Sequence, residues 1–439
     1  MSQYQDPAQA LSEFLAGQPE LTALTVAYSG GLDSHVLMHL VADLPALRPD
    51  IAIRALHINH RLQPASDDWA RHTEQIANRL NIPITVVPVE ISASHADGPE
   101  AAARLSRYAA FAEHLMPGEH IVLAQHADDQ AETFLLQALR GSGPDGLASI
   151  PRKRTFSKGF MSRPLLNCTR EQLQHYAEAH ELDFIHDPSN DDTRFDRNYL
   201  RHEILPRLQQ RWPAATRTLS RSANRCSAAS QTLLGLAQED LRQVRLRGVA
   251  ELSVSEMKTL PRERAYNVLR LWVRQSGLRM PRLQDLAEVY RQLLISRADS
   301  QGIVNVRDYE FRRHKDRLYL LLPQKEPTAF HYDWEAPFLP LSIPEIDQTL
   351  TREDCERQGI RLPSQGVITV RTRVGSELIK LGEPAFHKAV KKLLQEASVP
   401  PWLRDVTPLV YIDGRLAAVW EIAVAVDFRQ STSTPAEPV

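Results

Sequence analysis

The sequence of 439 residues contains few cysteines and no long hydrophobic run. Cys168, Cys226 and Cys355 stand far apart, so neither a disulfide framework nor a zinc-binding spacing is visible. No apolar stretch approaches the roughly 20 residues that a membrane-spanning helix needs. The first 20 residues include acids but lack the basic segment of a secretory signal. These absences predict a soluble, cytoplasmic protein without a membrane partner.

Charge of either sign is not in excess, because the formal net charge is only −2. The length predicts two or three domains, and a hydrophobic content of 43% is typical of globular proteins. The charges are unevenly distributed, however. Residues 204–225 contain no acid but five arginines, namely Arg207, Arg211, Arg217, Arg221 and Arg225. Their spacing places most of them on one side of a helix, which indicates either contact with RNA or DNA or an ordinary solvated face.

The first 140 residues alternate between strand-like and helix-like segments. Strands are expected at Thr25–Tyr28, Ile51–Ile58, Ile84–Val89 and His120–Ala124, and helices at Asp33–Leu44, Ser66–Leu80 with Ser66 as cap, Pro99–Leu115 and Asp128–Leu139. Repeated units of this kind predict an α/β fold, with a doubly wound, Rossmann-like parallel sheet. Ligands bind at the carboxyl ends of such strands. Three polar clusters lie there, at residues 29–34, 57–60 and 126–129.

The rest of the chain predicts two smaller domains after a catalytic domain at residues 1–213. Residues 214–326 are mostly helical, with a β-like stretch at Ile303–Leu322 and a linker at Pro323–Pro327. Residues 327–428 indicate a small α+β domain, with a strand at Gly366–Arg371 and a helix around His387–Ala397. Residues 429–439 are rich in Ser, Thr and Pro and predict a disordered tail.

The segment Ser29-Gly30-Gly31-Leu32-Asp33-Ser34 is typical of a loop that holds phosphates. Adjacent glycines let the backbone approach a ligand closely, and the following helix offers free N–H groups and a positive dipole end. A carboxylate beside a phosphate requires a cation between them. The segment therefore indicates a nucleotide pyrophosphate with Mg²⁺, the alternative being a simple turn capped by Ser34. It lacks the lysine of a Walker A motif.

A second cluster runs from His126 to Thr133 and contains Asp128, Asp129 and Glu132. Asp128 or Asp129 is expected to cap the helix that starts there. Capping accounts for one carboxylate, but not for three acids and a histidine. The additional acids are suited to binding an ammonium group or a metal ion.

These motifs resemble those of a known family. The first loop is similar to the PP-loop of the N-type ATP pyrophosphatases, and His-x-Asp-Asp-Gln-x-Glu-Thr after it resembles the tRNA(Ile)-lysidine synthetases. The supporting segments extend over nearly the whole chain: residues 57–62, 100–108, 140–147, 163–166, 187–201 and 391–405. Ile150, where many relatives carry Met, is a conservative departure.

The resemblance implies ligase activity on the wobble cytidine in the CAU anticodon of tRNA(Ile). ATP would adenylate the C2 oxygen of the base, and free L-lysine would displace AMP to form lysidine, with pyrophosphate released in the first step. The resemblance implies ATP and Mg²⁺ as cofactors, tRNA(Ile) and lysine as partners, and admits a homodimer.

The resemblance also assigns roles to residues. Ser29, Gly30, Gly31, Leu32, Asp33 and Ser34 would bind ATP, with Asp33 on Mg²⁺, and His57, Ile58 and Asn59 would lie near the adenine. Asp128, Asp129 and Glu132 would recognise lysine, while Arg104, Arg197 and Arg201 would stabilise charge at phosphates or at the lysine carboxylate. Asp33, Asp129 and these three arginines form the expected catalytic set.

Lys391, Lys392 and Arg404 would bind tRNA phosphates. Arg104 and the lysines could instead lie on solvated helix faces, and Trp402 is expected to be a core aromatic.

Two other functions remain open from the residues. A tRNA thiolase of the same superfamily would need a cysteine pair or an iron–sulfur set near the catalytic domain, where only Cys168 lies. A non-catalytic nucleotide- or RNA-binding protein would not need Asp128, Asp129 and Glu132 at the reacting edge.

Overall fold

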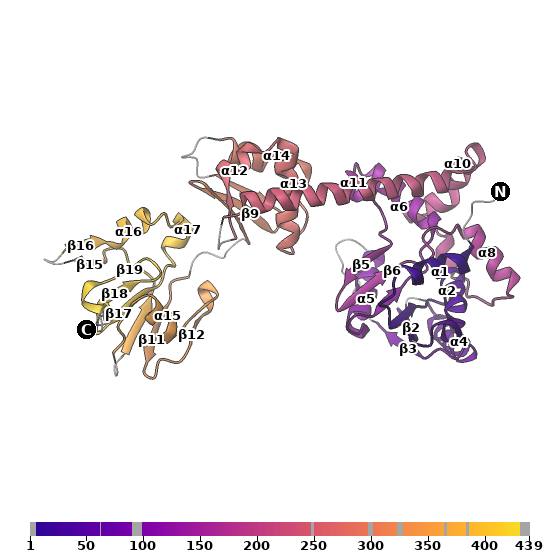
Figure 1. The fold of residues 1–439 in the computed structure, drawn as a ribbon, viewed down its shortest axis with the longest axis horizontal. Helices are drawn as coiled ribbons and strands as arrows, with labels where there is room; N and C mark the ends of the chain where they lie inside the picture. The colour runs from indigo at the N-terminus through magenta and orange to yellow at the C-terminus, as the bar shows by residue number, and fades with distance from the viewer. Residues whose placement is uncertain are drawn as a thin grey trace, which may run out of the picture. The chain divides into compact units, whose positions relative to one another are not determined.

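The computed structural model describes residues 6–61, 63–89, 99–246, 250–296, 302–322, 328–363, 367–382 and 386–430. The chain forms two compact units, Met1–Gly235 and Leu236–Val439 (Figure 1). The predicted linker at residues 323–327 and most of the predicted disordered tail, from residue 431 onward, lie outside the described residues. The division into three domains after residues 213 and 326 stays a prediction.

A six-stranded sheet organises the first unit. Its strands are β1 (Ala23–Ala27), β2 (Ala52–Asn59), β3 (Ile84–Pro88), β4 (His120–Val122), β5 (Lys153–Phe156) and β6 (Gly159–Ser162). Their order is β3-β2-β1-β4-β6-β5, and every neighbouring pair is parallel except the β5–β6 hairpin. The predicted α/β class with a parallel sheet is confirmed, and the antiparallel edge strand is an addition that the sequence did not predict.

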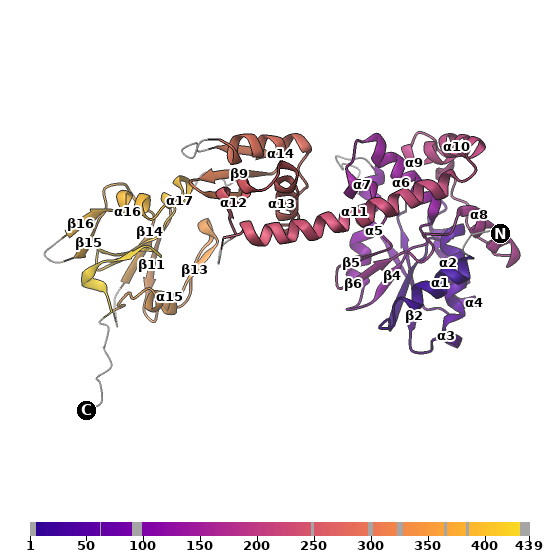
Figure 2. The ribbon, with the colours of Figure 1, turned by 45° about the horizontal axis from the view of Figure 1, so that its top comes forward.

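Helices cover both faces of this sheet (Figure 2). One face packs against α1 (Pro7–Ala16), α2 (Leu32–Ala42), α4 (Ser66–Arg79) and α8 (Arg170–Ala179), and the other packs against α5 (Pro99–His114). The strands alternate accordingly, so Val122 faces the α2 side and Ile121 the α5 side. Since the chain changes faces between β3 and β4, the carboxyl ends of β1 and β4 border the crevice where such sheets bind ligands.

The short helix α3 (Leu44–Leu47) lies between α2 and β2. After β4 come α6 (Ala127–Leu139) and α7 (Pro144–Leu147), and after α8 come α9 (Asp196–Tyr199), a π-helical turn at Leu200–Ile204 and α10 (Leu205–Arg211). The five arginines of residues 204–225 do not share one helix, although Arg217, Arg221 and Arg225 keep their four-residue spacing on α11. A break at Trp212–Ala214 separates α10 from α11 (Ala215–Val244), because Pro213 has no N–H for a helical hydrogen bond.

Two predicted helix caps also differ from the structure. Ser66 is the first residue of α4 rather than its cap, and its hydroxyl accepts a hydrogen bond from the Gln63 N–H (3.1 Å). The cap position of α6 is occupied by His126, not by Asp128 or Asp129. Asp129 instead reaches back to the His126 N–H, the reciprocal contact of a capping box.

The second unit begins with helices and a small antiparallel sheet. Its helices include the end of α11, α12 (Val254–Thr259), α13 (Arg262–Gln275), α14 (Leu283–Val289) and a π-helical turn at Tyr290–Leu294. The sheet has the order β7 (Leu252–Ser253), β10 (Arg317–Leu321), β9 (Tyr309–His314) and β8 (Ile303–Val306). The expected helical region with a β-like end is confirmed.

The C-terminal part is built from antiparallel strands with short helices. The five-stranded sheet has the order β11 (His331–Glu335), β14 (Val367–Arg371), β17 (Leu409–Ile412), β18 (Arg415–Val419) and β19 (Ala423–Val424). Two hairpins, β12 (Leu341–Ile343) with β13 (Gln348–Leu350) and β15 (Leu378–Gly382) with β16 (Phe386–Ala389), and helices α15 (Arg352–Arg357), α16 (Val390–Glu396) and α17 (Pro401–Arg404) complete it.

The helix predicted around residues 387–397 is wrong at its start, because residues 386–389 pair with β15 before α16 begins. Trp402 is a packed aromatic, as expected. Its ring meets Tyr319 edge-on at 5.2 Å, and the Arg312 guanidinium lies over it at 5.1 Å. Within the described ranges, no helix is both long and apolar enough to cross a membrane.

Candidate active site

The loop after β1 folds into a tight cradle at the start of α2. Gly30 has φ +87°, and its carbonyl accepts a hydrogen bond from the Ile185 N–H (2.9 Å). A Cβ at Gly30 would lie 2.5 Å from Ile185 Cδ1, so only glycine fits both the conformation and the space. The hydroxyls of Ser29 and Ser34 are 3.0 Å apart, and Ser34 also donates to the Gly31 carbonyl (3.0 Å). These contacts fix the loop while α2 presents its N-terminus.

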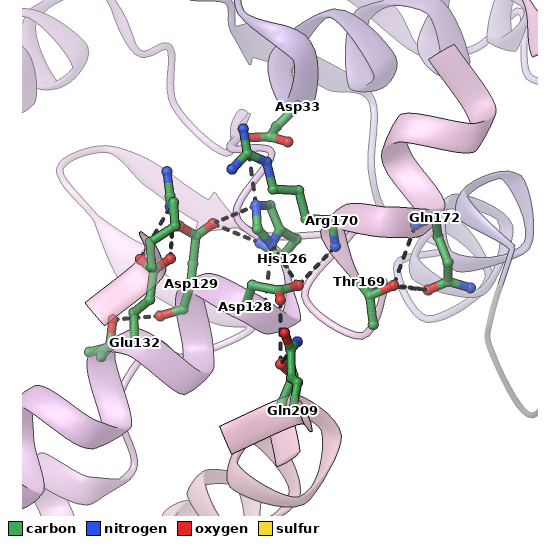
Figure 3. Close-up of polar contacts among 12 residues, drawn as sticks. Asp33, His126, Asp128, Asp129, Glu132, Thr169, Arg170, Gln172 and Gln209 are labelled. Atoms are coloured by element: carbon green, nitrogen blue, oxygen red, sulfur yellow. Dashed lines mark hydrogen bonds and ion pairs between the residues drawn. The ribbon is translucent and has the colours of Figure 1, made fainter. Parts of the chain in front are cut away.

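The turn between β4 and α6 places His126 among three carboxylates (Figure 3). Its Nε2 lies 3.6 Å from Asp33 Oδ2 and 3.5 Å from Asp129 Oδ2, and its Nδ1 lies 3.5 Å from Asp128 Oδ2. Asp33 comes from the loop after β1, and the other two come from α6 after β4. The structure therefore joins the two motifs across the crevice.

His126 is fully buried, and its charge state follows from these neighbours. Burial alone would lower the pKa of His126, but the Asp129, Asp128 and Asp33 carboxylates outweigh burial and raise this pKa well above 6.5. Burial raises the pKa values of Asp33 and Asp128, whereas contact with His126 lowers them below 3.8 overall. The surrounding carboxylates accordingly favour the protonated form of His126. Its Nε2 faces the Asp33 and Asp129 carboxylates, and its Nδ1 faces Asp128 Oδ2 and lies 3.3 Å from the Asp128 backbone nitrogen.

Arg201, from the π-helical turn after α9, completes the cluster. Its Nε donates to Glu132 Oε1 (2.7 Å), and its Nη2 lies 3.1 Å from both Glu132 Oε2 and Asp129 Oδ1. Glu132 is completely buried, and burial raises its pKa while Arg201 opposes the shift. One turn earlier, Arg197 donates to the Thr133 hydroxyl (2.9 Å). The predicted residues Asp33, Asp128, Asp129, Glu132, Arg197 and Arg201 thus converge on one place.

The other predicted residues lie elsewhere. His57 and Asn59 are buried at the end of β2, where His57 Nδ1 lies 2.9 Å from the Tyr28 carbonyl oxygen and Asn59 donates to Asp67 (2.8 Å); Ile58 lies between them. Arg104 donates to the Tyr108 hydroxyl (3.2 Å). Lys391 and Lys392 are exposed on α16, and Arg404 donates to the Val399 carbonyl (2.9 Å); all three belong to the second unit. The roles of all these residues stay predictions.

Three residues of the site, His126, Arg170 and Thr216, had no predicted role. His126 stood in the motif but was not assigned a role, although its position between a strand end and acids was a usable signal. The Arg170 N–H donates to Asp128 Oδ2 (2.8 Å), and the Thr216 hydroxyl lies 3.4 Å from Asp128 Oδ1. Both come from segments 42 and 88 residues away, so no local pattern in the sequence could have identified them.

Comparisons with known proteins agree with this geometry. A model of the PP-loop domain matches residues 4–208, the TilS substrate binding domain matches residues 252–319, and the TilS substrate C-terminal domain matches residues 368–437. The tRNA(Ile)-lysidine synthase of Coxiella burnetii is 40% identical over 94% of this chain and 91% of its own length. That of Alkalilimnicola ehrlichii is 39% identical over 96% and 94%, respectively.

Among solved structures, the U34-tRNA thiolase NcsA of Methanococcus maripaludis covers 50% of this chain and 76% of its own, with 15% identity. Its TM-score of 0.41 is too low to bear on function. The sequence relatives, by contrast, match at substantial identity over nearly the full length of both chains. On this basis, the chain belongs to the tRNA(Ile)-lysidine synthase family.

Proposed function

We propose that this protein uses ATP to join lysine to C2 of the wobble cytidine in the CAU anticodon of tRNA(Ile), forming lysidine and releasing AMP and pyrophosphate. The observation that carries the proposal is the meeting of the loop after β1 with the His126 cluster at the carboxyl ends of β1 and β4. An adenylating enzyme needs a phosphate cradle and groups that manage charge within reach of each other.

The loop at residues 29–34 is suited to the ATP phosphates, because the α2 N-terminus and the serine hydroxyls offer donors without a Cβ at Gly30. Asp33 Oδ1 is buried and has no hydrogen-bond partner in the described part of the chain. A carboxylate oxygen of this kind fits Mg²⁺, which takes few protein ligands and completes its shell with phosphates and water. Bound there, Mg²⁺ would neutralise phosphate charge and favour departure of pyrophosphate.

The acids and arginines of the cluster have complementary roles in the proposal. Asp129 and Asp128 supply carboxylate charge for the amino groups of lysine, and Arg197 and Arg201 supply guanidinium donors for its carboxylate or for phosphate oxygens. Glu132 holds Arg201 through two hydrogen bonds, so we assign it a share in orienting that arginine as well. Contact with His126 lowers the pKa of Asp33 and so favours the ionised form of the proposed Mg²⁺ ligand.

The cysteines offer no support for thiolation. Cys168 is fully buried, and burial raises the pKa of its thiol to about 12, which removes the nucleophilic thiolate at neutral pH. Cys355 belongs to the second unit, and burial raises its pKa to about 12 as well. Cys226, on α11, is half-buried and has no second cysteine beside it in the sequence.

The test is to measure AMP and pyrophosphate release with ATP, tRNA(Ile) bearing a CAU anticodon, and lysine, each omitted in turn, and to identify the modified nucleoside. Release that requires the tRNA, with lysidine formed only when lysine is present, is the expected result. A methionine tRNA with the same CAU anticodon serves as the control. ATP binding without turnover would contradict the enzyme assignment. A homodimer and a cytoplasmic setting stay predictions from the sequence.

A further inference from the structure

A group of arginines that has no acidic partner among the described residues lies beside the His126 cluster. Residues 146–170 contain no Asp or Glu but six basic residues: Arg152, Lys153, Arg154, Lys158, Arg163 and Arg170. Two of these, Arg154 and Arg163, lie near Tyr108 of α5 together with Arg104. We call Arg104, Tyr108, Arg154 and Arg163 the Tyr108 cluster.

The two exposed arginines of the Tyr108 cluster lie against the same aromatic ring. The Arg104 guanidinium carbon is 4.9 Å from the Tyr108 ring centroid, and that of Arg154 is 5.4 Å from it. Arg104 also donates to the Tyr108 hydroxyl (3.2 Å), and Arg154 has Met161 Sδ at 3.5 Å. Contact with an aromatic ring orients each guanidinium but leaves its charge uncompensated.

The third arginine, Arg163, is only 3% exposed. Its donors meet neutral acceptors: Gln125 Oε1 (2.7 Å), the Pro151 carbonyl (2.9 Å) and Met161 Sδ (3.1 Å). Burial lowers the pKa of Arg163 to about 10; Tyr108 opposes this shift, and the charges of Arg154 and Arg104 add to it. Within the described ranges, none of the three arginines has a carboxylate partner. A buried charge without a counter-ion is costly, so the arrangement favours an anion.

The position of the Tyr108 cluster relates it to the active site. Arg163 directly follows β6, Arg154 pairs with Met161 in the β5–β6 hairpin, and α5 begins at the same carboxyl edge of the sheet. Gln125, which holds Arg163, immediately precedes His126. Along the sheet, β6 is two strands away from β1, about 10 Å at the usual strand spacing. The anion would therefore lie next to the reacting centre but not in the loop that cradles ATP.

We propose that Arg104 and Arg154, oriented by Tyr108 and backed by Arg163, bind a backbone phosphate of the RNA substrate close to the nucleotide that is modified. The inference rests on the proposed function and assigns it a substrate contact. Guanidinium groups suit this ligand because their paired N–H donors match two phosphate oxygens. Holding the backbone there would fix the position of the base relative to ATP. The alternative source of the same chemistry is a phosphate of ATP itself, and the distance from β1 argues against it.

The test replaces Arg154 with glutamine in the full-length protein, because Arg154 is exposed and its loss leaves no cavity. Binding of tRNA(Ile) is measured over a series of salt concentrations, and binding of ATP is measured separately. For R154Q, the Kd for tRNA should rise about tenfold, and the slope of log Kd against log salt should fall by about one unit. The Kd for ATP should keep its wild-type value. Arg154→Lys should keep the salt slope but lose part of the affinity, since it retains the charge without the paired donors.

Arg71→Gln is the matched control, because Arg71 is also an exposed arginine of the first unit but pairs with Asp68 on its own helix. It should change neither Kd. Unaltered tRNA binding by R154Q would overturn the inference, and a raised Kd for ATP with unaltered tRNA binding would assign the phosphate to the nucleotide and overturn it too. Lysidine formation by the wild-type protein is assayed in parallel, so that failure of the phosphate site can be told apart from failure of the proposed function. If the wild-type protein forms lysidine and R154Q binds tRNA as the wild type does, only the phosphate site is rejected.

Discussion

At the scale of single residues, Asp33 and His126 connect the two halves of the site. Each motif taken alone has an ordinary structural interpretation, a glycine turn in one case and a helix cap in the other. The pairing of Asp33 with His126 removes that ambiguity, because a turn and a cap have no need to share an ion pair across two strands. The contacts at the bottom of the crevice therefore point to chemistry more strongly than either motif does.

Replacing Asp33 with alanine should abolish adenylation and spare tRNA binding. Asp33 Oδ1 is a buried carboxylate oxygen with no hydrogen-bond partner among the described residues, and its proposed role is to hold Mg²⁺ at the ATP phosphates. Loss of that charge stabilisation should lower kcat/KM for AMP release by at least about 10²-fold. Asp68→Ala, on the exposed surface of α4, is the control and should keep full activity. Wild-type turnover in Asp33→Ala would refute the assignment.

The raised pKa of His126 predicts a particular dependence of stability on pH. A histidine whose folded pKa exceeds its unfolded value of about 6.5 stabilises the fold fully below that pH, and the contribution is lost as pH rises through the folded pKa. His126→Asn should therefore cost about 3–5 kcal/mol near pH 6, and the cost should shrink as pH rises above 6.5. Calorimetric melting of wild type and variant between pH 5 and 9 measures it.

His120 is the matched control, because it is buried in the same sheet but burial lowers its pKa to about 4. The pH dependence is therefore reversed. The difference in free energy of unfolding between wild type and His120→Asn should be full above pH 6.5 and should decline as pH falls towards 4. Parallel pH profiles for the two variants would show that His126 is not the charged member of its cluster.

At the scale of helices and strands, the tight loop after β1 depends on one glycine. Gly30→Ala would place a methyl group against Ile185 and force φ +87° on an L-residue, at a cost of about 1–2 kcal/mol for the conformation alone. Because the loop must then shift, KM for ATP should rise by tenfold or more. The added variant Ile185→Val should recover part of this loss by removing the contacting Cδ1. Gly17→Ala, where the new Cβ meets no atom closer than 3.5 Å, should have no effect on ATP.

The sequence predicted the elements of the first unit well where residue types favour one structure. The predicted strand at Ile84–Val89 and the observed β3 differ by one residue, because the β-branched run from Ile84 to Val87 favours a strand. The β5–β6 hairpin was not predicted, since Lys153 and its neighbours form an exposed edge strand without that pattern. Contacts such as Arg201 with Glu132, 69 residues apart, depend on the fold as a whole, and only the family resemblance suggested that these residues act together.

At the scale of the whole molecule, contact with tRNA phosphates is favoured by local positive charge, yet the chain as a whole is slightly acidic. Most described basic residues of the C-terminal part are paired: Lys388 with Glu396, Lys380 with Asp427, and Arg373 with Asp405. Lys391 and Lys392 are exposed next to each other on α16. They are therefore the stronger candidates for phosphate contacts in this part of the protein.

The double variant Lys391→Gln/Lys392→Gln should weaken tRNA binding without affecting ATP. If each lysine neutralises one phosphate, the slope of log Kd against log salt should fall by about 1.5, because each contact contributes roughly 0.7 to 0.9. Filter binding or fluorescence titration at salt concentrations from about 50 to about 200 mM measures the change in slope. Arg352→Gln/Arg357→Gln removes two charges from an exposed helix of the same unit, but these arginines pair with Glu356 and Asp354. This control should keep the wild-type slope. An equal fall in slope for the two double variants would show that net charge, not contact by α16, attracts the tRNA.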